Sequence, residues 1–291
     1  MNNIALNIGI AGIGKMGQNH LRELEKNNLF NIVGLYDLHK KENINYPFFN
    51  NINEFLNLNL DVVIIATPTI SHLNVAKKIL QKIRVVLIEK PLAMNLKEML
   101  EIKALSKKYG SLVGVGFSER FNPSILELKN ILKKKEIISI NINRYSPYPS
   151  RISDVGIIQD LSVHDIDLIS FLSNRCITNS FLIKRNIYDK QREDEVMITC
   201  ELENIIANIH QSWNVKDRYR NIVVICKDCV FEADLINFTL KQNGNSILLN
   251  QTSPLNNEHN ALYSLAKDSR FGNMADINCA INVEKIICKY H

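Results

Sequence analysis

The sequence has no apolar run long enough to cross a membrane, and no cationic segment followed by an apolar stretch opens it. It also lacks internal repeats and low-complexity segments. These absences predict an ordinary globular protein, soluble and cytoplasmic. Its 291 residues are enough for a sizeable core and most naturally form two domains.

Neither sign of charge dominates the composition. The 35 Lys+Arg residues exceed the 30 Asp+Glu residues by a formal net charge of only +5. This balance suits an anionic small molecule such as a nucleotide and gives no reason to expect nucleic acid or membrane as a partner. We interpret the densest basic run, KNILKKKE, as the solvated end of a helix.

Cysteine is scarce, with 6 residues scattered along the chain and one pair at C-x-x-C spacing, Cys226 and Cys229. A tetrahedral zinc site needs two more ligands at similar spacing. We therefore interpret this segment as a hairpin with Lys227 and Asp228 at its turn, and we expect no metal there.

The first part of the chain alternates apolar runs with helical patterns. Near-continuous Val/Ile strands separated by helices predict a parallel sheet covered on both faces, which is an α/β Rossmann (doubly wound) domain. The expected strands are 6–12, 31–37, 61–67, 84–91 and 111–117, and the expected helices are 15–27, 70–82 and 95–109. Asn95 and Gly110 have the residue types that cap the last helix. Residues 38–50 lack a helical period, so one crossover is expected to be a loop.

After about residue 120 the pattern changes to closely spaced strands with a few helices. The expected helices are 121–134, 159–172, 258–268 and 275–290, and the expected strands are 136–143, 181–187, 195–202, 205–213, 221–226, 229–240 and 246–250. This order predicts an α+β domain with a mostly antiparallel open sheet. The sequence thus divides into a dinucleotide-binding domain, 1–119, and a substrate and oligomerisation domain, 120–291.

The segment GIAGIGKMG has the G-x-G-x-x-G spacing, after a strand and at the start of a helix. The first glycine permits a tight turn, the second lets a pyrophosphate approach the backbone, and the third allows close helix packing. A turn without a ligand is the alternative. The expected cofactor contacts here are Gly12, Ile13, Gly14, Lys15 and Met16, with Gly17 as the packing glycine.

Asp37 ends the second strand, twenty positions after Gly17. An acidic residue there bonds the ribose hydroxyls and repels a 2′-phosphate. The sequence therefore favours NAD over NADP, although Lys40 and Lys41 follow closely and soften this preference.

Two further segments lie at the carboxyl ends of parallel strands, the edge where doubly wound sheets bind ligands. ATPTISH brings Thr67, Pro68 and His72 to that edge. IEKP brings Glu89 and Lys90, with Lys90 held between Glu89 and Pro91. A surface lysine would be the ordinary interpretation elsewhere in a chain.

The segment QDLSVHDIDL places Asp160, His164 and Asp167 on one face of a helix, because positions i, i+4 and i+7 stack. Apolar residues occupy most other directions, so the helix is expected to be buried. Charged groups on a buried helix must be paired or line a pocket. A structural histidine, a metal triad and a catalytic group all fit this pattern, whereas Asp165 points elsewhere and is expected to be structural.

The glycine loop, Asp37, ATPTISH, EKP, GFSERFNP and the D-x-x-x-H segment together resemble the Gfo/Idh/MocA (glucose–fructose oxidoreductase/inositol dehydrogenase) family. The resemblance covers nearly the whole chain. It implies a Rossmann domain that binds NAD(P), an α+β domain on the substrate side and no metal. It also implies that Lys90, Asp160 and His164 are the catalytic residues of an oxidoreductase acting on a CH–OH group.

Oxidation of an alcohol requires the hydroxyl to lose a proton while its carbon gives up a hydride. We expect His164 to be the general base, because its ordinary pKa lies near working pH. Lys90 is expected to stabilise the developing oxygen charge, and Asp160 to orient the other two.

GFSERFNPSILELK and RYSPYPSRISDVGIIQDLSVHDIDL resemble the family's UDP-N-acetylglucosamine 3-dehydrogenases. Such enzymes oxidise the sugar's C3 hydroxyl, and an aminotransferase partner aminates the 3-keto product on the route to lipid A. The expected substrate contacts are Arg120, Asn122, Arg144 and Arg151. The three arginines suit a nucleotide-sugar diphosphate, since guanidinium groups match phosphate oxygens. Alternatively, some of these arginines pair with nearby acids such as Glu119 or Asp154. The chain departs from the pattern in 251–275 and in the short loop after the second strand.

Other functions stay open at this point. The chain could act on another sugar, polyol or uronate sugar nucleotide, or it could be a non-catalytic sugar-sensing regulator. The joint presence of Lys90, Asp160 and His164 speaks against the regulator. Family sheets commonly pair face to face through the second domain, so a homodimer or homotetramer is expected.

Overall fold

The computed structural model describes residues 4–39, 44–149, 156–188 and 190–290. The chain forms two compact units. The first contains Met1–Ser118 and Pro254–Ile281, and the second contains Glu119–Ser253 and Asn282–His291. The chain passes between units next to the expected boundary at 119. In contrast to the expected division, 254–281 clusters with the first unit.

The first unit contains a seven-stranded sheet in the order β15-β6-β5-β4-β1-β2-β3. Every neighbouring pair is parallel except β15 with β6. The strands are β1 (Leu6–Ala11), β2 (Phe30–Tyr36), β3 (Phe48–Phe49), β4 (Val62–Ile65), β5 (Val85–Glu89), β6 (Leu112–Gly116) and β15 (Ala275–Asp276). All four residues of β4 and all five of β5 are buried, as a sheet covered on both faces requires.

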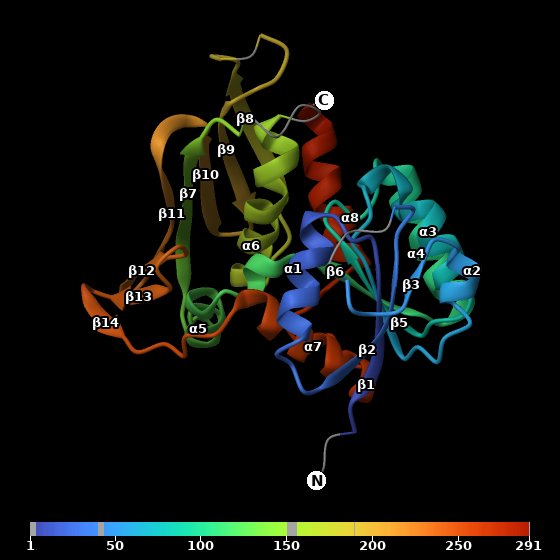
Figure 1. Cartoon of the computed structure of the whole chain (residues 1–291). Coiled ribbons are helices and arrows are strands. Elements are labelled where there is room, and N and C mark those ends of the chain that lie inside the picture. Colours follow the sequence, from blue (N-terminus) through green and yellow to red (C-terminus); the bar gives the residue numbers. More distant parts are fainter. Residues whose placement is uncertain (1–3, 40–43, 150–155, 189, 291) are drawn as a thin grey trace. The chain divides into compact units, whose positions relative to one another are not determined.

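Helices cover both faces of this sheet (Figure 1). On one face α1 (Lys15–Leu24) contacts α7 (Pro254–Asp268), and on the other α3 (His72–Ile79) contacts α4 (Leu96–Tyr109). Asn95 caps α4 by accepting a hydrogen bond from the Glu98 amide, and Gly110 ends it with φ 68°. The predicted caps and the Rossmann class are thus confirmed. The expected loop at 38–50 ends in the short β3, followed by the one-turn helix α2 (Ile52–Phe55).

The second unit contains an eight-stranded sheet in the order β14-β13-β12-β11-β7-β10-β9-β8. Its pairs are antiparallel apart from β7 with β10, which confirms the mostly antiparallel prediction. The strands are β7 (Ile137–Pro147), β8 (Asn179–Arg185), β9 (Glu195–Leu202), β10 (Ile205–Ser212), β11 (Asn214–Cys226), β12 (Val230–Asp234), β13 (Thr239–Gln242) and β14 (Asn245–Ile247).

Strand register gives this sheet one buried face. Ile198, Ile209, Ile142 and Ile222 lie opposite one another in a row across four strands, and all are buried. Helices α5 (Pro123–Leu132) and α6 (Val163–Ser173) contact strands of the sheet and each other (Figure 1). Residues on the alternate rows point to the other face, since side chains alternate along a strand.

One expected strand of the second unit is divided in the structure, and the expected hairpin beside it is present. The strand expected over 229–240 is divided into β12 and β13 by a turn in which Asp234 accepts backbone hydrogen bonds from Ile236 and Asn237. The expected Cys226–Cys229 hairpin is confirmed, because the Cys226 amide donates to the Cys229 carbonyl at 2.8 Å. Helix α8 (Ile277–Ile287) begins in the first unit and ends in the second.

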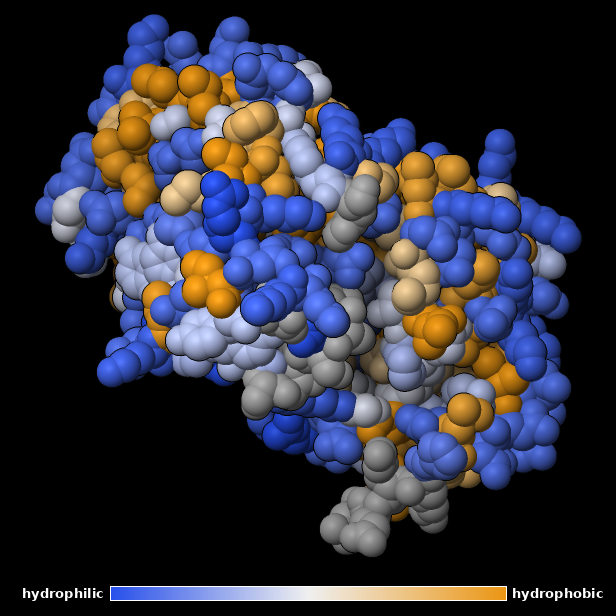
Figure 2. Space-filling view, turned by 90° about the horizontal axis from the view of Figure 1, so that it is seen from above, coloured by the Kyte–Doolittle hydropathy of each residue, from blue (hydrophilic) through white to orange (hydrophobic). Residues whose placement is uncertain are grey.

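Among the described residues, no helix has the length and apolarity needed to span a membrane. In the view of Figure 2, hydrophilic residues predominate and hydrophobic ones form separate patches.

Candidate active site

The glycine loop follows β1 at the carboxyl edge of the first sheet. Gly12 has φ +96°, and a Cβ there would lie 2.4 Å from the Thr67 amide nitrogen. A Cβ on Gly17 would lie 1.9 Å from the Gly12 carbonyl oxygen. Only glycine fits either position, which agrees with the predicted tight turn and close helix packing.

Gly14 is the exception within this loop. An added Cβ there meets nothing of the described structure within 4 Å, so the protein itself does not require glycine for space. Gly14 is also the N-cap of α1 and provides no side-chain cap to the helix amides. A helix N-terminus of this kind attracts an anion, and a bare backbone lets it come close.

Asp37 follows β2 and lies against the same loop. Its Oδ2 accepts a hydrogen bond from the Ile13 amide at 2.6 Å, and its Oδ1 accepts one from the His39 amide at 3.3 Å. These bonds fix the carboxylate beside the predicted pyrophosphate turn. Lys40 and Lys41, expected to soften the preference for NAD, lie outside the described residues.

The loop after β4 is tied to the loop after β5 by a histidine. The buried His72 ring faces the Thr67 carbonyl through Nε2 at 2.8 Å and the Pro91 carbonyl through Nδ1 at 3.0 Å. Burial lowers the pKa of His72, and the hydrogen bonds to the Thr67, Leu92 and Pro91 carbonyls oppose that shift. These contacts join the two loops, and the predicted cofactor contact of His72 stays a prediction. Thr67 is half-buried and Pro68 exposed on this loop.

Lys90 is half-buried at the carboxyl end of β5, next to the ends of β4 and β1 in the sheet order. Its backbone amide donates to Glu89 Oε2 at 3.2 Å, and the Lys90–Pro91 peptide is cis. Glu89 is buried, and its Oε1 lies 2.8 Å from His20 Nε2. Glu89 thus has contacts within the protein, and its predicted cofactor contact stays a prediction, while Lys90 lies at the predicted edge.

The predicted helix of the second unit begins with a π-helical turn, Ile158–Ser162, and continues as α6. Asp160 and His164 are half-buried, whereas Asp165 and Asp167 are buried. π-Helical turns often occur at functional sites, because they shift side chains out of the regular helical register. Here the turn contains Asp160, and α6 begins at the next residue after the turn.

Both buried aspartates of α6 are paired with arginines. Asp167 receives two hydrogen bonds of 2.6 Å from Arg120 Nε and Nη2, a bidentate pair. Asp165 receives bonds from Arg144 and from Gln211. Burial raises the pKa of Asp167, and Arg120 offsets part of that rise. The structural role predicted for Asp165 agrees with these contacts.

Arg144 also contacts Glu119, with 3.3 Å between Nη1 and Oε1, and Glu119 pairs in turn with Arg220. Burial alone lowers the pKa of Arg144, but Asp165 and Glu119 outweigh it, so that its pKa is raised. The alternative of pairing with nearby acids therefore holds for Arg144.

The other expected substrate contacts also have partners within the chain or lie outside the described residues. Arg120 is engaged by Asp167. Asn122 caps α5 through the Ser124 amide and donates to the Leu235 carbonyl. Arg120, Asn122 and Arg144 thus have partners within the chain, and their predicted contacts with substrate stay predictions. Arg151 and Asp154 lie outside the described residues.

Sequence reasoning did not identify His20, Glu258 or His259. His20 Nδ1 lies 2.9 Å from His259 Nε2, so the two imidazoles and Glu89 form a continuous buried chain. The sequence of α7 does indicate that Glu258 is buried. Leu262 and Leu265 follow it by four and seven residues, so all three lie on one buried face of the helix.

The metal interpretation of Asp160, His164 and Asp167 has no geometric support. In the described part of the chain, the potential ligand atoms that gather within 4.8 Å of one another belong to a different set, His20, Glu89 and Glu258. Cys226 and Cys229 are not in that set either.

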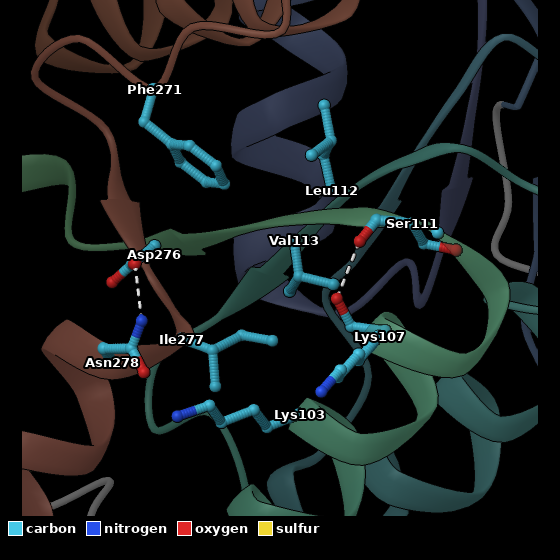
Figure 3. A pocket seen from close by; sticks show the side chains of 11 residues that line it. Lys103, Lys107, Ser111, Leu112, Val113, Phe271, Asp276, Ile277 and Asn278 are labelled. Atoms are coloured by element: carbon cyan, nitrogen blue, oxygen red, sulfur yellow. Dashed lines mark hydrogen bonds between the residues drawn. The ribbon is translucent and has the colours of Figure 1, made fainter.

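A pocket of about 340 Å³ lies elsewhere in the first unit, where α4 leads into β6 (Figure 3). Lys103 and Lys107 line it, but Asp276 is already bonded to the Asn278 side chain. The pocket is at the amino end of β6, whereas the glycine loop and Lys90 follow the carboxyl ends of their strands. It is therefore separate from the candidate site.

Family comparison assigns both parts of the chain. Residues 6–117 match the model described as the oxidoreductase family with an NAD-binding Rossmann fold, and residues 136–232 match the GFO/IDH/MocA C-terminal domain. The chain belongs to the GFO/IDH/MocA oxidoreductase family. The predicted family, enzyme class and NAD cofactor are thereby confirmed.

Relatives within the GFO/IDH/MocA family are distant. Glucose-6-phosphate 3-dehydrogenase of Bacillus subtilis (strain 168) is 25% identical over 256 residues, 79% of this chain and 71% of that protein. UDP-N-acetylglucosamine 3-dehydrogenase of Acidithiobacillus ferrooxidans is 23% identical over 244 residues, 81% of this chain and 76% of that one.

Solved structures of this GFO/IDH/MocA type show the same fold. A structure of the A. ferrooxidans UDP-N-acetylglucosamine 3-dehydrogenase has a TM-score of 0.90 at 21% identity and covers 98% of this chain and 96% of its own. GenD2 from gentamicin A biosynthesis, solved in complex with NAD, has a TM-score of 0.83 at 16% identity. It covers 99% of this chain and 93% of its own. At such identities the likeness concerns the fold.

Proposed function

We propose that this oxidoreductase uses NAD to oxidise the C3 hydroxyl of UDP-N-acetylglucosamine to a 3-keto sugar nucleotide. The observation that carries the redox part is Lys90, located at the carboxyl end of β5 on the sheet edge that also carries the glycine loop. A doubly wound sheet binds its ligands along that edge. The sugar nucleotide is supported by the segments GFSERFNP and RISDVG and by the similarity to the A. ferrooxidans enzyme.

Three side chains divide the chemistry in this proposal. His164 takes the proton of the C3 hydroxyl, and the Lys90 ammonium donates a hydrogen bond to that oxygen as it becomes a carbonyl. Asp160, four residues before His164 and in the π-helical turn, orients the base. NAD, when bound beside the glycine loop, would supply the hydride acceptor. The proposal requires Lys90 of the first unit and the Asp160–His164 pair of the second to act on one substrate.

The same proposal fixes the form of the cofactor and one substrate contact. Asp37, held beside the glycine loop by the Ile13 amide, repels a 2′-phosphate and favours NAD over NADP. Direct titration with NADH and NADPH tests this point, and tighter NADPH binding would contradict it. Arg151 is the predicted arginine that we retain as a contact for the diphosphate.

We further propose a homodimer or homotetramer in which the open face of the second sheet is covered by another copy. Phe181 is 67% exposed and Met197 52% exposed, and the register places Met197 opposite Ile183 on that face. Exposed apolar residues gathered on one face mark an association surface. Light scattering of wild type and of Phe181→Glu tests this; unchanged mass in the variant would contradict it.

The reaction also implies an aminotransferase that consumes the 3-keto product. Oxidation of a sugar alcohol by NAD has an unfavourable equilibrium, so removal of the ketone drives it forward. The functional test mixes protein, NAD and UDP-N-acetylglucosamine with such an aminotransferase and its amino donor, and follows the ultraviolet absorbance of NADH. NADH formation that depends on this sugar nucleotide supports the proposal.

A second candidate substrate is glucose 6-phosphate, favoured by the 25% identity to the B. subtilis 3-dehydrogenase. Glucose 6-phosphate and myo-inositol therefore belong in the same assay. If either is oxidised with a higher kcat/KM than UDP-N-acetylglucosamine, the substrate part of the proposal is wrong while the enzyme class stands.

A further inference from the structure

A cluster of ionisable side chains lies in the interior of the first unit, formed by three elements far apart in sequence. His20 comes from α1, Glu89 from the end of β5, and Glu258 from α7. His20 and Glu258 have no exposed surface, and Glu89 is 7% exposed. One potential ligand atom of each lies within 4.8 Å of the other two.

Glu258 is the unusual member of this cluster. Both of its carboxylate oxygens are buried, and neither has a hydrogen-bond partner among the described residues. An ionised carboxylate buried without a partner costs several kcal/mol, and a second carboxylate close by adds repulsion. Two species relieve such a group, a proton or a cation.

The arrangement of His20 favours the cation. Its Nδ1 is 2.9 Å from His259 Nε2, so a neighbouring imidazole fixes the ring and directs Nε2 toward Glu89. Metal-binding histidines are typically held in this way, by a hydrogen bond through the nitrogen that does not bind the ion.

We propose that His20 Nε2, Glu89 and Glu258 bind a divalent transition-metal cation that fastens α7 to α1 and β5. One imidazole and two carboxylates are a donor set for Zn²⁺ or Mn²⁺, and the imidazole disfavours Ca²⁺ and Mg²⁺. Tetrahedral ligand atoms about 2.1 Å from zinc lie about 3.4 Å apart. The His20 Nε2–Glu89 Oε1 distance of 2.8 Å is below that spacing, and the limit of 4.8 Å within the cluster is above it. The ion neutralises both carboxylates and has no part in hydride transfer.

The test uses the full-length protein, purified without added metal, and needs no activity assay. Elemental analysis gives the metal content as isolated, and Co²⁺ titration of chelator-treated protein is followed by visible absorption. The proposal predicts one bound equivalent and a rise in Tm with metal concentration, since an ion that binds only the folded state stabilises it. Glu258→Gln, which keeps the shape of the side chain, is expected to weaken binding at least about a hundredfold.

Glu195→Gln is the matched control. Glu195 also contacts a histidine, with 2.7 Å between its Oε1 and His210 Nε2, but that pair is not part of the three-residue cluster. Metal binding by this variant is expected to equal that of wild type. His20→Gln provides a second test of the site if Glu258→Gln does not fold.

Three results would overturn the proposal. Wild type that binds no equivalent of Co²⁺ or Zn²⁺, together with Glu258→Gln of unchanged Tm, would mean that the Glu258 carboxyl carries a proton. Binding that survives in both Glu258→Gln and His20→Gln would place the ion elsewhere, with Cys226 and Cys229 the first residues to examine. Binding lost equally in a folded Glu195→Gln variant would show that the ion is not held by the three-residue cluster.

Discussion

The two units bury charge in different ways. In the second unit, Asp165 and Asp167 of α6 and the neighbouring Glu119 all meet guanidinium groups, from Arg144, Arg120 and Arg220. In the first unit, Glu89 and Glu258 gather around the imidazoles of His20 and His259. One set is a network of complete ion pairs. The other contains a buried carboxyl group, Glu258, that the described side chains do not satisfy.

The difference separates charges that maintain the fold from charges available to a ligand. A bidentate pair such as Arg120 with Asp167 engages the Nε and Nη2 donors of the arginine and joins Arg120 to α6. A buried group without a partner requires an explanation outside the side chains present. In the first unit, Glu258 is such a group.

The largest expected effect is on turnover. Lys90→Ala should lower kcat roughly a thousandfold or more, because it removes the donor to the developing carbonyl oxygen. NADH affinity and Tm should change little. Steady-state kinetics and NADH titration measure both quantities. Lys103→Ala, at the separate pocket of the same unit, is the control. Equal loss of activity in both variants would contradict the role of Lys90.

The next effect concerns the ion pairs of the second unit. Arg120→Met leaves Asp167 buried without its partner and should lower the unfolding free energy by about 3–5 kcal/mol, measured by urea denaturation. Adding Asp167→Leu should restore most of that loss. Arg175→Ala breaks the exposed pair with Glu203 and should cost less than about 1 kcal/mol. If Arg120→Met instead affected only KM, Arg120 would be a substrate ligand after all.

Two glycines of one loop sharpen the distinction between fold and ligand. Gly17→Ala should destabilise the protein by about 1–3 kcal/mol, since its Cβ meets the Gly12 carbonyl. Gly14→Ala should leave Tm unchanged and weaken NADH binding about tenfold, roughly 1.4 kcal/mol, because the added methyl occupies the path of the pyrophosphate. Thermal denaturation and NADH fluorescence distinguish the two. Equal NADH affinity in Gly14→Ala and wild type would place the pyrophosphate elsewhere.

The smallest effect depends on pH. Burial lowers the pKa of His72 below its unfolded value of about 6.5. As pH falls below that value, the unfolded chain takes up a proton that the folded ring does not, so stability decreases by up to about 1.4 kcal/mol per pH unit until the folded pKa is reached. His72→Asn should remove this part of the dependence. Identical pH profiles of unfolding free energy for both proteins would show that His72 does not contribute.

The sequence predicted the elements and their order well because apolar periodicity and turn residues are local signals. The parallel strands of the first unit, the Asn95 and Gly110 caps and the Cys226–Cys229 hairpin all depend on neighbouring residues. The assignment of α7 to the first unit does not depend on neighbouring residues. Helix α7 follows the last strand of the second unit, and its apolar face would suit either unit.

The candidate site was predicted less completely, because many of its contacts join residues that are far apart in the sequence. Gly12, Gly17 and Asp37 lie within one motif, and the structure gives them the expected local geometry. Arg120 and Arg144 pair with Asp167 and Asp165, which lie 47 and 21 residues away in the sequence, so no local pattern indicated these pairs. His20 and Glu258 are separated by most of the chain and carry no motif.

Transfer of a labelled hydride tests the central claim most directly. UDP-N-acetylglucosamine carrying deuterium at C3 is incubated with the enzyme, NAD and an aminotransferase that removes the ketone, and the reduced cofactor is analysed by mass spectrometry. We expect deuterated NADH from the wild type and none from Lys90→Ala. Unlabelled NADH would show that oxidation occurs at another carbon, and the absence of any NADH would contradict the proposed reaction.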